Sequence, residues 1–160
     1  MNNDVLIADL ASRARRAAQT LKSASYLERQ RALNAIADAV ETHASEILAA
    51  NQEDTDRERA SGMSESLLDR LTLNSSRISG IAGGTRKVAS LEDPLGQVIR
   101  QRTLANGLHL TQVTVPFGVV GMVYEARPNV TIDAAVILLM SGNAALLRGS
   151  SSARPPSAPP

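Results

Sequence analysis

The residues of this 160-residue sequence that could do chemistry lie in one segment, 124–129, and around position 148. Asn129 carries a side-chain amide that can donate a hydrogen bond to a developing oxyanion. Arg127 and Arg148 each carry a guanidinium group that can bind a phosphate or a carboxylate. Structural alternatives stay open at this point. N-capping of a helix explains an asparagine at this position equally well, and a single arginine is more often simply exposed.

The remaining polar residues offer less to a mechanism. Glu125 is expected to pair with Arg127 rather than to act as a base. The sequence contains no cysteine, so it supplies no thiol nucleophile and no thiolate zinc site. Its two histidines, His43 and His109, lie far apart without a carboxylate cluster, so we interpret both as structural or solvated and predict no metal site. Residues 118–121, Gly-Val-Val-Gly, do not satisfy the G-x-G-x-x-G fingerprint of a dinucleotide site.

Composition and charge argue against two classes of partner. With 17 Lys and Arg against 16 Asp and Glu, the net charge is +1, whereas a nucleic-acid binder normally has a pI above about 9. Aromatic residues make up 2% of the sequence, too few for a base-stacking surface. The longest apolar run, Ala134 to Met140, is far shorter than the roughly 20 residues of a membrane helix. We therefore expect a cytoplasmic protein with no nucleic-acid and no membrane partner.

Residues 1–96 are predicted to be helical and to support the candidate segment. Apolar residues recur at helical spacing between positions 5 and 22. Ser25 and Glu28 have the spacing of a capping box, in which each side chain bonds the backbone amide of the other residue. The predicted boundaries of the later helices are Ser25 to about Asn51 or slightly beyond, with Gly62 as the stop, then starts at Ser64 and Asn74.

Residues 97–115 are predicted to form a β-hairpin. Two β-favouring runs, 97–104 and 108–115, flank Ala105-Asn106-Gly107. Asn-Gly supplies the positive φ angles of a tight turn at low steric cost. Polar residues interrupt both runs, so the ribbon has a face exposed to water. Because a two-stranded ribbon is marginal alone, it needs a further surface to pack against.

Residues 116–149 are predicted to form a β-α-β unit of a Rossmann-like parallel sheet. The continuous apolar run 117–124 is typical of a strand buried on both faces, which parallel sheets require. A helix is expected over 131–141 and a second buried strand over 144–148, with a right-handed crossover. The sequence therefore predicts the α/β class. Ligands of such sheets bind at the carboxyl ends of the strands, where the candidate residues lie.

Two stretches, 115–135 and 141–149, resemble the gamma-glutamyl phosphate reductase family. Its members are also called glutamate-5-semialdehyde dehydrogenases and belong to the aldehyde dehydrogenase superfamily. Residues 124–131, Tyr-Glu-Ala-Arg-Pro-Asn-Val-Thr, are highly specific to this family. The similarity covers roughly residues 5–153. Shorter matches lie at 67–71 and 93–96.

This resemblance implies the N-terminal piece of an aldehyde dehydrogenase fold. The implied parts are the helical part of the nucleotide-binding domain (1–96), an oligomerisation hairpin (97–115) and the first β-α-β unit of the nucleotide-binding domain (116–149). Pairing through the hairpin would supply the surface that the ribbon needs. A homo-oligomer is therefore expected.

The activity that the resemblance implies is the second step of proline biosynthesis. L-Glutamyl 5-phosphate is reduced by NADPH to L-glutamate 5-semialdehyde, and phosphate is released. In such enzymes a cysteine thiolate attacks the acyl phosphate, an oxyanion hole holds the intermediate, and hydride reduces the thioester. The resemblance assigns oxyanion stabilisation to Asn129 and substrate binding to Arg127. It assigns contact with the NADPH cofactor to Arg148 and Gly149.

The sequence also departs from the family pattern. Complete members are much longer and carry their nucleophilic cysteine in a later domain, whereas these 160 residues contain none. Residues 150–160, rich in Ser and Pro, are predicted to form a disordered tail. Our hypothesis for this tail is a frameshift, a premature stop or a gene-prediction error. We expect the chain to be inactive alone. The alternatives are a non-catalytic interaction or dimerisation fragment and, more weakly, a nucleotide-binding domain of unrelated function.

Overall fold

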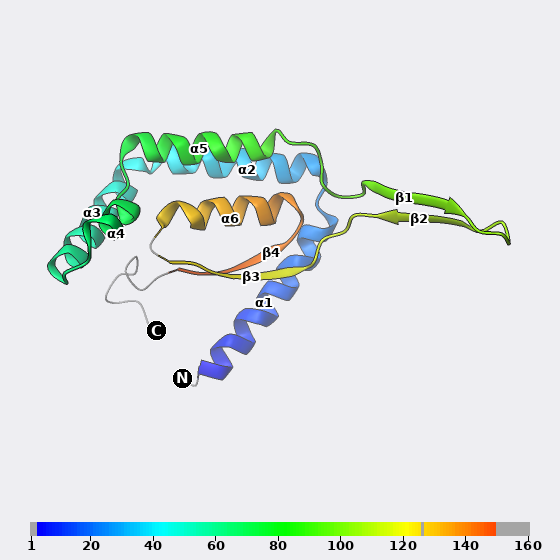
Figure 1. Ribbon diagram of the computed structural model, residues 1–160, viewed down its shortest axis with the longest axis horizontal. Coiled ribbons are helices and arrows are strands. Elements are labelled where there is room, and N and C mark those ends of the chain that lie inside the picture. Colours follow the sequence, from blue (N-terminus) through cyan, green and yellow to red (C-terminus); the bar gives the residue numbers. More distant parts are fainter. Residues whose placement is uncertain (1–2, 126, 150–160) are drawn as a thin grey trace.

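The computed structural model describes residues 3–125 and 127–149. In this part of the chain, the regular elements are helices and two pairs of strands (Figure 1). The elements in chain order are α1 (Asn3–Ser23), α2 (Tyr26–Thr42), α3 (Ala44–Ala60), α4 (Glu65–Leu71), α5 (Ser75–Ala89), β1 (Val98–Thr103), β2 (His109–Val113), β3 (Val119–Val123), α6 (Pro128–Met140) and β4 (Ala144–Arg148). The predicted α/β class is confirmed. The predicted tail, 150–160, lies outside the described residues.

The core lies where three helices meet. Helices α2 and α5 run side by side, and α6 packs against both of them and against β4 (Figure 1). Leu33 of α2, Ala89 of α5, and Val136 and Met140 of α6 form one buried cluster. Helix α1 contacts both β3 and β4. Helix α6, which carries Asn129, is therefore held from the helical side and from the strand side.

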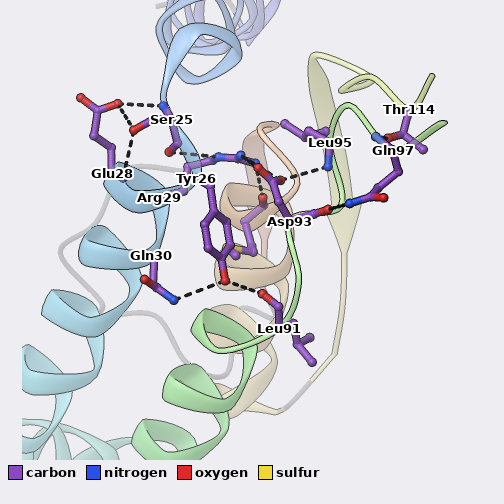
Figure 2. Close-up of polar contacts among 11 residues, drawn as sticks. Ser25, Tyr26, Glu28, Arg29, Gln30, Leu91, Asp93, Leu95, Gln97 and Thr114 are labelled. Atoms are coloured by element: carbon purple, nitrogen blue, oxygen red, sulfur yellow. Dashed lines mark hydrogen bonds and ion pairs between the residues drawn. The ribbon is translucent and has the colours of Figure 1, made fainter.

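The start of α2 is fixed by the predicted capping box and by a buried arginine beside it. The Ser25 amide donates to Glu28 Oε2 at 2.7 Å, and the Glu28 amide donates to Ser25 Oγ at 3.3 Å. The Arg29 guanidinium donates to both carboxylate oxygens of Asp93, at 2.9 and 2.7 Å, and to the Met140 carbonyl at 2.7 Å (Figure 2). These bonds join α2 to the end of α6 and to the segment that leads into the hairpin.

The single helix predicted from Ser25 to about Asn51 is wrong, because the helix breaks at His43. His43 has φ −97° and ψ 18°, and α3 begins directly after it. No Gly or Pro marks the break in the sequence. Tertiary contacts explain the new direction of α3. The Asn51 side chain donates to the Leu71 carbonyl at 2.9 Å and accepts from the Leu73 amide at 2.6 Å.

Helices α4 and α5 begin at the predicted residues. Ser64 is the N-cap residue of α4, and Asn74 caps α5 by accepting from the Arg77 amide at 2.8 Å. Helix α5 continues without interruption through Gly83 and Gly84. Its buried residues pack against α2 and α6, and this tertiary packing outweighs the helix propensity that two glycines lose.

The predicted β-hairpin is confirmed and projects away from the helices (Figure 1). Strands β1 and β2 pair antiparallel, from Val98 opposite Val113 to Thr103 opposite His109. Gly107 has a φ of +84°, as the predicted Asn-Gly turn requires. Every residue of both strands is exposed, so the ribbon has no dry face within the described structure.

The predicted parallel β-α-β unit is present, but its first strand is not buried. Val119 of β3 pairs with Ala144 of β4, and Val123 pairs with Arg148. Four of the five β3 residues are exposed, and Phe117 just before the strand is 93% exposed. The prediction of a strand buried on both faces is therefore wrong. The physical reason is that β4 is the only strand paired with β3 in the described residues, so one edge of β3 stays uncovered.

Candidate functional site

Asn129 lies inside the first turn of α6 and not at its cap. Helix α6 starts three residues earlier than predicted, with Arg127 as the N-cap residue and Pro128 as the first helical residue. Proline suits this position because its φ is helical and it has no amide to leave unpaired. The Val130 amide donates to the Arg127 carbonyl at 3.0 Å. N-capping therefore does not explain Asn129.

The side chain of Asn129 is oriented by a carboxylate on the same helix. Its Nδ2 donates to Asp133 Oδ2 at 3.1 Å, one helical turn further on. A carboxylate only accepts hydrogen bonds, so the nitrogen end of the amide faces Asp133. The amide nitrogen has a second N–H, and no bond from it to another described residue is formed. This second N–H can serve a ligand.

Arg127, Asn129 and Asp133 line one wall of a cleft of about 380 Å³. The other wall comes from the end of α4, the first turns of α5 and the turn between them, which lie at the same side of the molecule as the start of α6 (Figure 1). The residues of this second wall are Asp69, Arg70, Thr72, Leu73, Arg77, Gly80 and Ile81. The cleft thus has three guanidinium groups and two carboxylates. This charge pattern is suited to an anionic ligand.

The expected ion pair between Glu125 and Arg127 is not formed, and this part of the prediction is wrong. Both residues are exposed, and no ion pair joins them although both are described. The Arg127 guanidinium makes no hydrogen bond or ion pair with any residue in 3–125 or 127–149. It therefore remains available to a ligand in the cleft.

Arg148 and Gly149 lie at the carboxyl end of β4, outside the lining of this cleft. The exposed Arg148 donates to the Gly149 carbonyl at 2.5 Å. A Cβ on Gly149 would lie 3.3 Å from the Tyr124 hydroxyl, which in turn lies 2.5 Å from Thr131 Oγ1. Tyr124 thus joins the carboxyl ends of β3 and β4 to the first turns of α6.

The two histidines occupy exposed positions away from the cleft. His43 Nδ1 lies 3.3 Å from Glu46 Oε2, and His109 Nδ1 lies 3.0 Å from Thr103 Oγ1. Within residues 3–125 and 127–149 no three His, Cys, Asp or Glu side chains come together as a metal site would require. None of the helices in that part of the chain is both long and apolar enough to cross a membrane.

The sequence interpretation missed the second wall of the cleft. Asp69, Arg70 and Arg77 are distant from Asn129 in the sequence, and only the packing of α5 against α6 brings them near. Asp133 could have been found, because residues four apart on a helix are neighbours.

The fold and the cleft define a class of α/β protein with a helical layer, a projecting hairpin and a parallel β-α-β unit whose helix start carries the site. No family model matches the chain. Among solved structures, the chain is similar to gamma-glutamyl phosphate reductase from Thermotoga maritima, with 40% identity and a TM-score of 0.86. That match covers 89% of this chain and 34% of the other.

The chain is also similar to gamma-glutamyl phosphate reductase from Saccharomyces cerevisiae. The identity is 38% and the TM-score 0.87, over 91% of this chain and 37% of the yeast chain. The chain is thus related in sequence and fold to gamma-glutamyl phosphate reductases and spans about a third of their length. The resemblance inferred from residues 115–135 and 141–149 is confirmed, and the match is consistent with the N-terminal part of these enzymes.

Proposed function

We propose that these residues form part of an NADPH-dependent gamma-glutamyl phosphate reductase. The reaction reduces L-glutamyl 5-phosphate to L-glutamate 5-semialdehyde and releases phosphate, as a step of proline biosynthesis. The observation that carries this proposal is the agreement of sequence and fold, 38–40% identity at TM-scores of 0.86–0.87, over nearly all of this chain. A cytoplasmic location belongs to the same proposal.

In this proposal Asn129 stabilises the oxyanion. Acyl transfer from a phosphate places negative charge on the carbonyl oxygen, and a fixed N–H donor lowers the energy of that charge. The bond from Asn129 to Asp133 fixes the amide before the substrate binds. The start of α6 adds the positive end of the helix dipole. The free guanidinium of Arg127, two residues earlier, binds the phosphate of the substrate.

Arg148 and Gly149 are proposed to contact the cofactor, Arg148 at the adenosine ribose. Arg148 ends β4 and Gly149 follows it, at the strand end where ligands of parallel sheets bind. Gly149 leaves room beside the Tyr124 ring that a larger residue would fill. When bound, NADPH supplies the hydride. The role of the protein residues is to hold the cofactor and to aim the carbonyl.

Residues 97–115 are proposed to join subunits into a homo-oligomer. Apolar side chains are exposed along the ribbon, including Ile99 at 62% and Leu108 at 56%. Exposed apolar surface of this kind marks interaction sites. Addition of a second ribbon would also stabilise a hairpin that is marginal by itself.

A chimera tests the proposed function. Residues 3–149 replace the matching part of the Thermotoga maritima enzyme, and NADP⁺ reduction is measured with glutamate 5-semialdehyde and phosphate. We expect activity from the chimera and none from the 160-residue chain, which has no cysteine to form the thioester. A folded chimera that lacks activity would contradict the proposal. Turnover by the chain alone would contradict its expected inactivity.

The exposed ribbon and the absence of a cysteine also favour a second candidate, a non-catalytic interaction fragment. This candidate predicts that the chain forms dimers or co-elutes with an intact homologue. Light scattering on the eluted protein distinguishes the states. A monomer at all concentrations, with no co-elution, would exclude this second candidate.

A further inference from the structure

The cleft holds a second free guanidinium group, to which neither the resemblance nor the proposed function assigns a role. Arg70 lies on α4, on the wall that faces the start of α6, and its side chain is exposed. Its guanidinium forms no hydrogen bond or ion pair with other residues of the described structure. Arg127 on the other wall is equally unpaired. The cleft therefore offers one free cation on each wall.

Arg77 fixes the position of the wall that carries Arg70. Its guanidinium donates to the carbonyls of Asp69 and Thr72, the latter at 2.5 Å, and to Asp69 Oδ1 at 3.0 Å. These groups belong to the end of α4 and the turn after it, where helix carbonyls lack partners within the helix. Arg77 thus holds α4 against the first turn of α5. Because the Arg77 guanidinium is already paired with the Asp69 carboxylate, we do not assign it to a ligand.

Both carboxylates of the cleft are also engaged. Asp69 is paired with Arg77, and Asp133 accepts from Asn129 at 3.1 Å. Neither forms an ion pair with Arg70 or Arg127, although all four residues are described. The positive charges that remain for a ligand are those of Arg70 and Arg127. They belong to different elements, α4 and the start of α6.

We propose that Arg70 binds the α-carboxylate of an amino-acid substrate. This inference rests on the proposed function, in which the acyl end of the substrate lies at Asn129 and Arg127. An acidic amino acid activated at its side chain carries an anion at each end. A cleft with one free guanidinium on each wall matches that pattern, because a guanidinium binds a carboxylate through two parallel hydrogen bonds.

Two ligands that differ only at the α-carboxylate test the proposal on the 160-residue chain by NMR titration. L-Glutamine has a free α-carboxylate, whereas in L-glutaminamide this group is replaced by a neutral amide and the side chain is the same. We expect glutamine to bind about tenfold more tightly, which matches the strength of hydrogen bonds to a charged group. Arg70→Gln removes this difference. Arg70→Lys retains part of it, since charge remains without the two-pronged geometry.

The control is Arg15→Gln, which removes an exposed arginine from α1, outside the cleft and the ribbon. This variant keeps the preference for glutamine. Equal binding of the two ligands, no binding of glutamine, or an unchanged preference in folded Arg70→Gln would each overturn the proposal. The dispersion of the amide spectrum reports whether each variant is folded.

The same substitution in the chimera separates this inference from the proposed function. We expect Arg70→Gln to raise KM for the semialdehyde about tenfold with kcat nearly unchanged, the pattern of a lost interaction that the ground state and the transition state share. An active chimera whose KM does not change contradicts the role of Arg70 but leaves the function intact. An inactive chimera combined with binding of glutamine by the chain contradicts the function and leaves the carboxylate site intact.

Discussion

The helical side of the molecule and its strand side differ in how fully their groups are satisfied. Around α2, α5 and α6, apolar residues are buried together, and in the described part of the chain every buried side-chain nitrogen and oxygen has a hydrogen-bond partner. On the strand side, Ile99, Phe117 and Val123 are 62, 93 and 82% exposed. The cleft is lined by residues of α4, α5, the turn between them and the start of α6, so it lies on the helical side. The apolar side chains exposed on the strand side are where we expect a partner to bind.

The largest expected effect is the loss of Arg29 on the helical side. Arg29→Ala removes the guanidinium from the partly buried Asp93 carboxylate, which keeps its bond from the Leu95 amide, and takes the Arg29 donor away from the Met140 carbonyl. Removal of one partner of a buried ion pair costs about 3–5 kcal/mol. Urea denaturation measures the free energy of unfolding. The matched control, Arg100→Ala on the hairpin, is expected to change it by no more than about 0.5 kcal/mol. Similar losses of unfolding free energy in Arg29→Ala and Arg100→Ala would contradict the difference between the helical side and the strand side.

Two glycines with positive φ give the next largest effect. Gly142 has φ +72°, and a Cβ there would lie 2.9 Å from Leu95 Cδ1 and 3.0 Å from Pro116 Cγ. Gly107 in the hairpin turn has φ +84° with open space around it. Gly142→Ala combines backbone strain with close contacts from which the Leu95 and Pro116 side chains must shift, and is expected to cost about 2–4 kcal/mol. Gly107→Ala is expected to cost about 1 kcal/mol, from the backbone alone.

Thermal unfolding of both alanine variants checks this difference. An equal loss of stability would show that the contacts of Gly142 with Leu95 and Pro116 do not constrain the chain. The two positions have similar φ angles. The difference in stability between the two variants therefore measures the cost of the contacts around Gly142, apart from the cost of a positive φ angle.

A smaller effect is expected at the cap of α2. Ser25→Ala removes an N-cap side chain, which costs about 1 kcal/mol. The hydrogen bonds from the Ser25 hydroxyl and amide lower the pKa of Glu28 below its ordinary value of 4.5. Because the folded-state pKa is lowered, this stabilisation is present above the unfolded-state pKa and is lost as the pH falls through the folded-state value.

The pH dependence of unfolding checks this mechanism. The difference in stability between the unmodified chain and Ser25→Ala should be largest above about pH 5 and should shrink at lower pH. A difference that does not vary between pH 3 and 7 would show that the ionised Glu28 side chain takes no part in the cap. This pH range is chosen because the pKa of Glu28 in the folded chain is lowered from 4.5.

The smallest effect on stability is expected on the strand side. Ile99 is exposed in β1, so Ile99→Asp should change the free energy of unfolding by less than about 0.5 kcal/mol. It should nevertheless abolish association through the ribbon. Sedimentation at several concentrations measures the association. Loss of stability in a monomeric sample, or unchanged association, would contradict an interface at residues 97–115.

The elements that the sequence predicted correctly have local signals. The capping box at Ser25, the cap at Asn74 and the Asn-Gly turn act over a few residues, so no tertiary information is needed. The break at His43 has no such signal. It depends on how Asn51 contacts residues that follow α4 in the chain.

The candidate site was predicted in part for the same reason. Arg127 and Asn129 belong to one segment, so their proximity is given by the chain itself. Arg70 and Arg77 reach the cleft only through the packing of α5 against α6, which periodicity does not specify. The exposure of β3 was missed because a long apolar run predicts burial, whereas burial also requires neighbouring elements.

The central claim is that Asn129 is an oxyanion donor in a reductase site, and the turnover of the chimera tests it most directly. Asn129→Ala should lower kcat by about 100- to 1000-fold, the cost of one lost oxyanion donor. Asn34→Ala, which removes an exposed asparagine from α2, should leave kcat unchanged. A folded Asn129→Ala chimera that keeps the full kcat would contradict the claim.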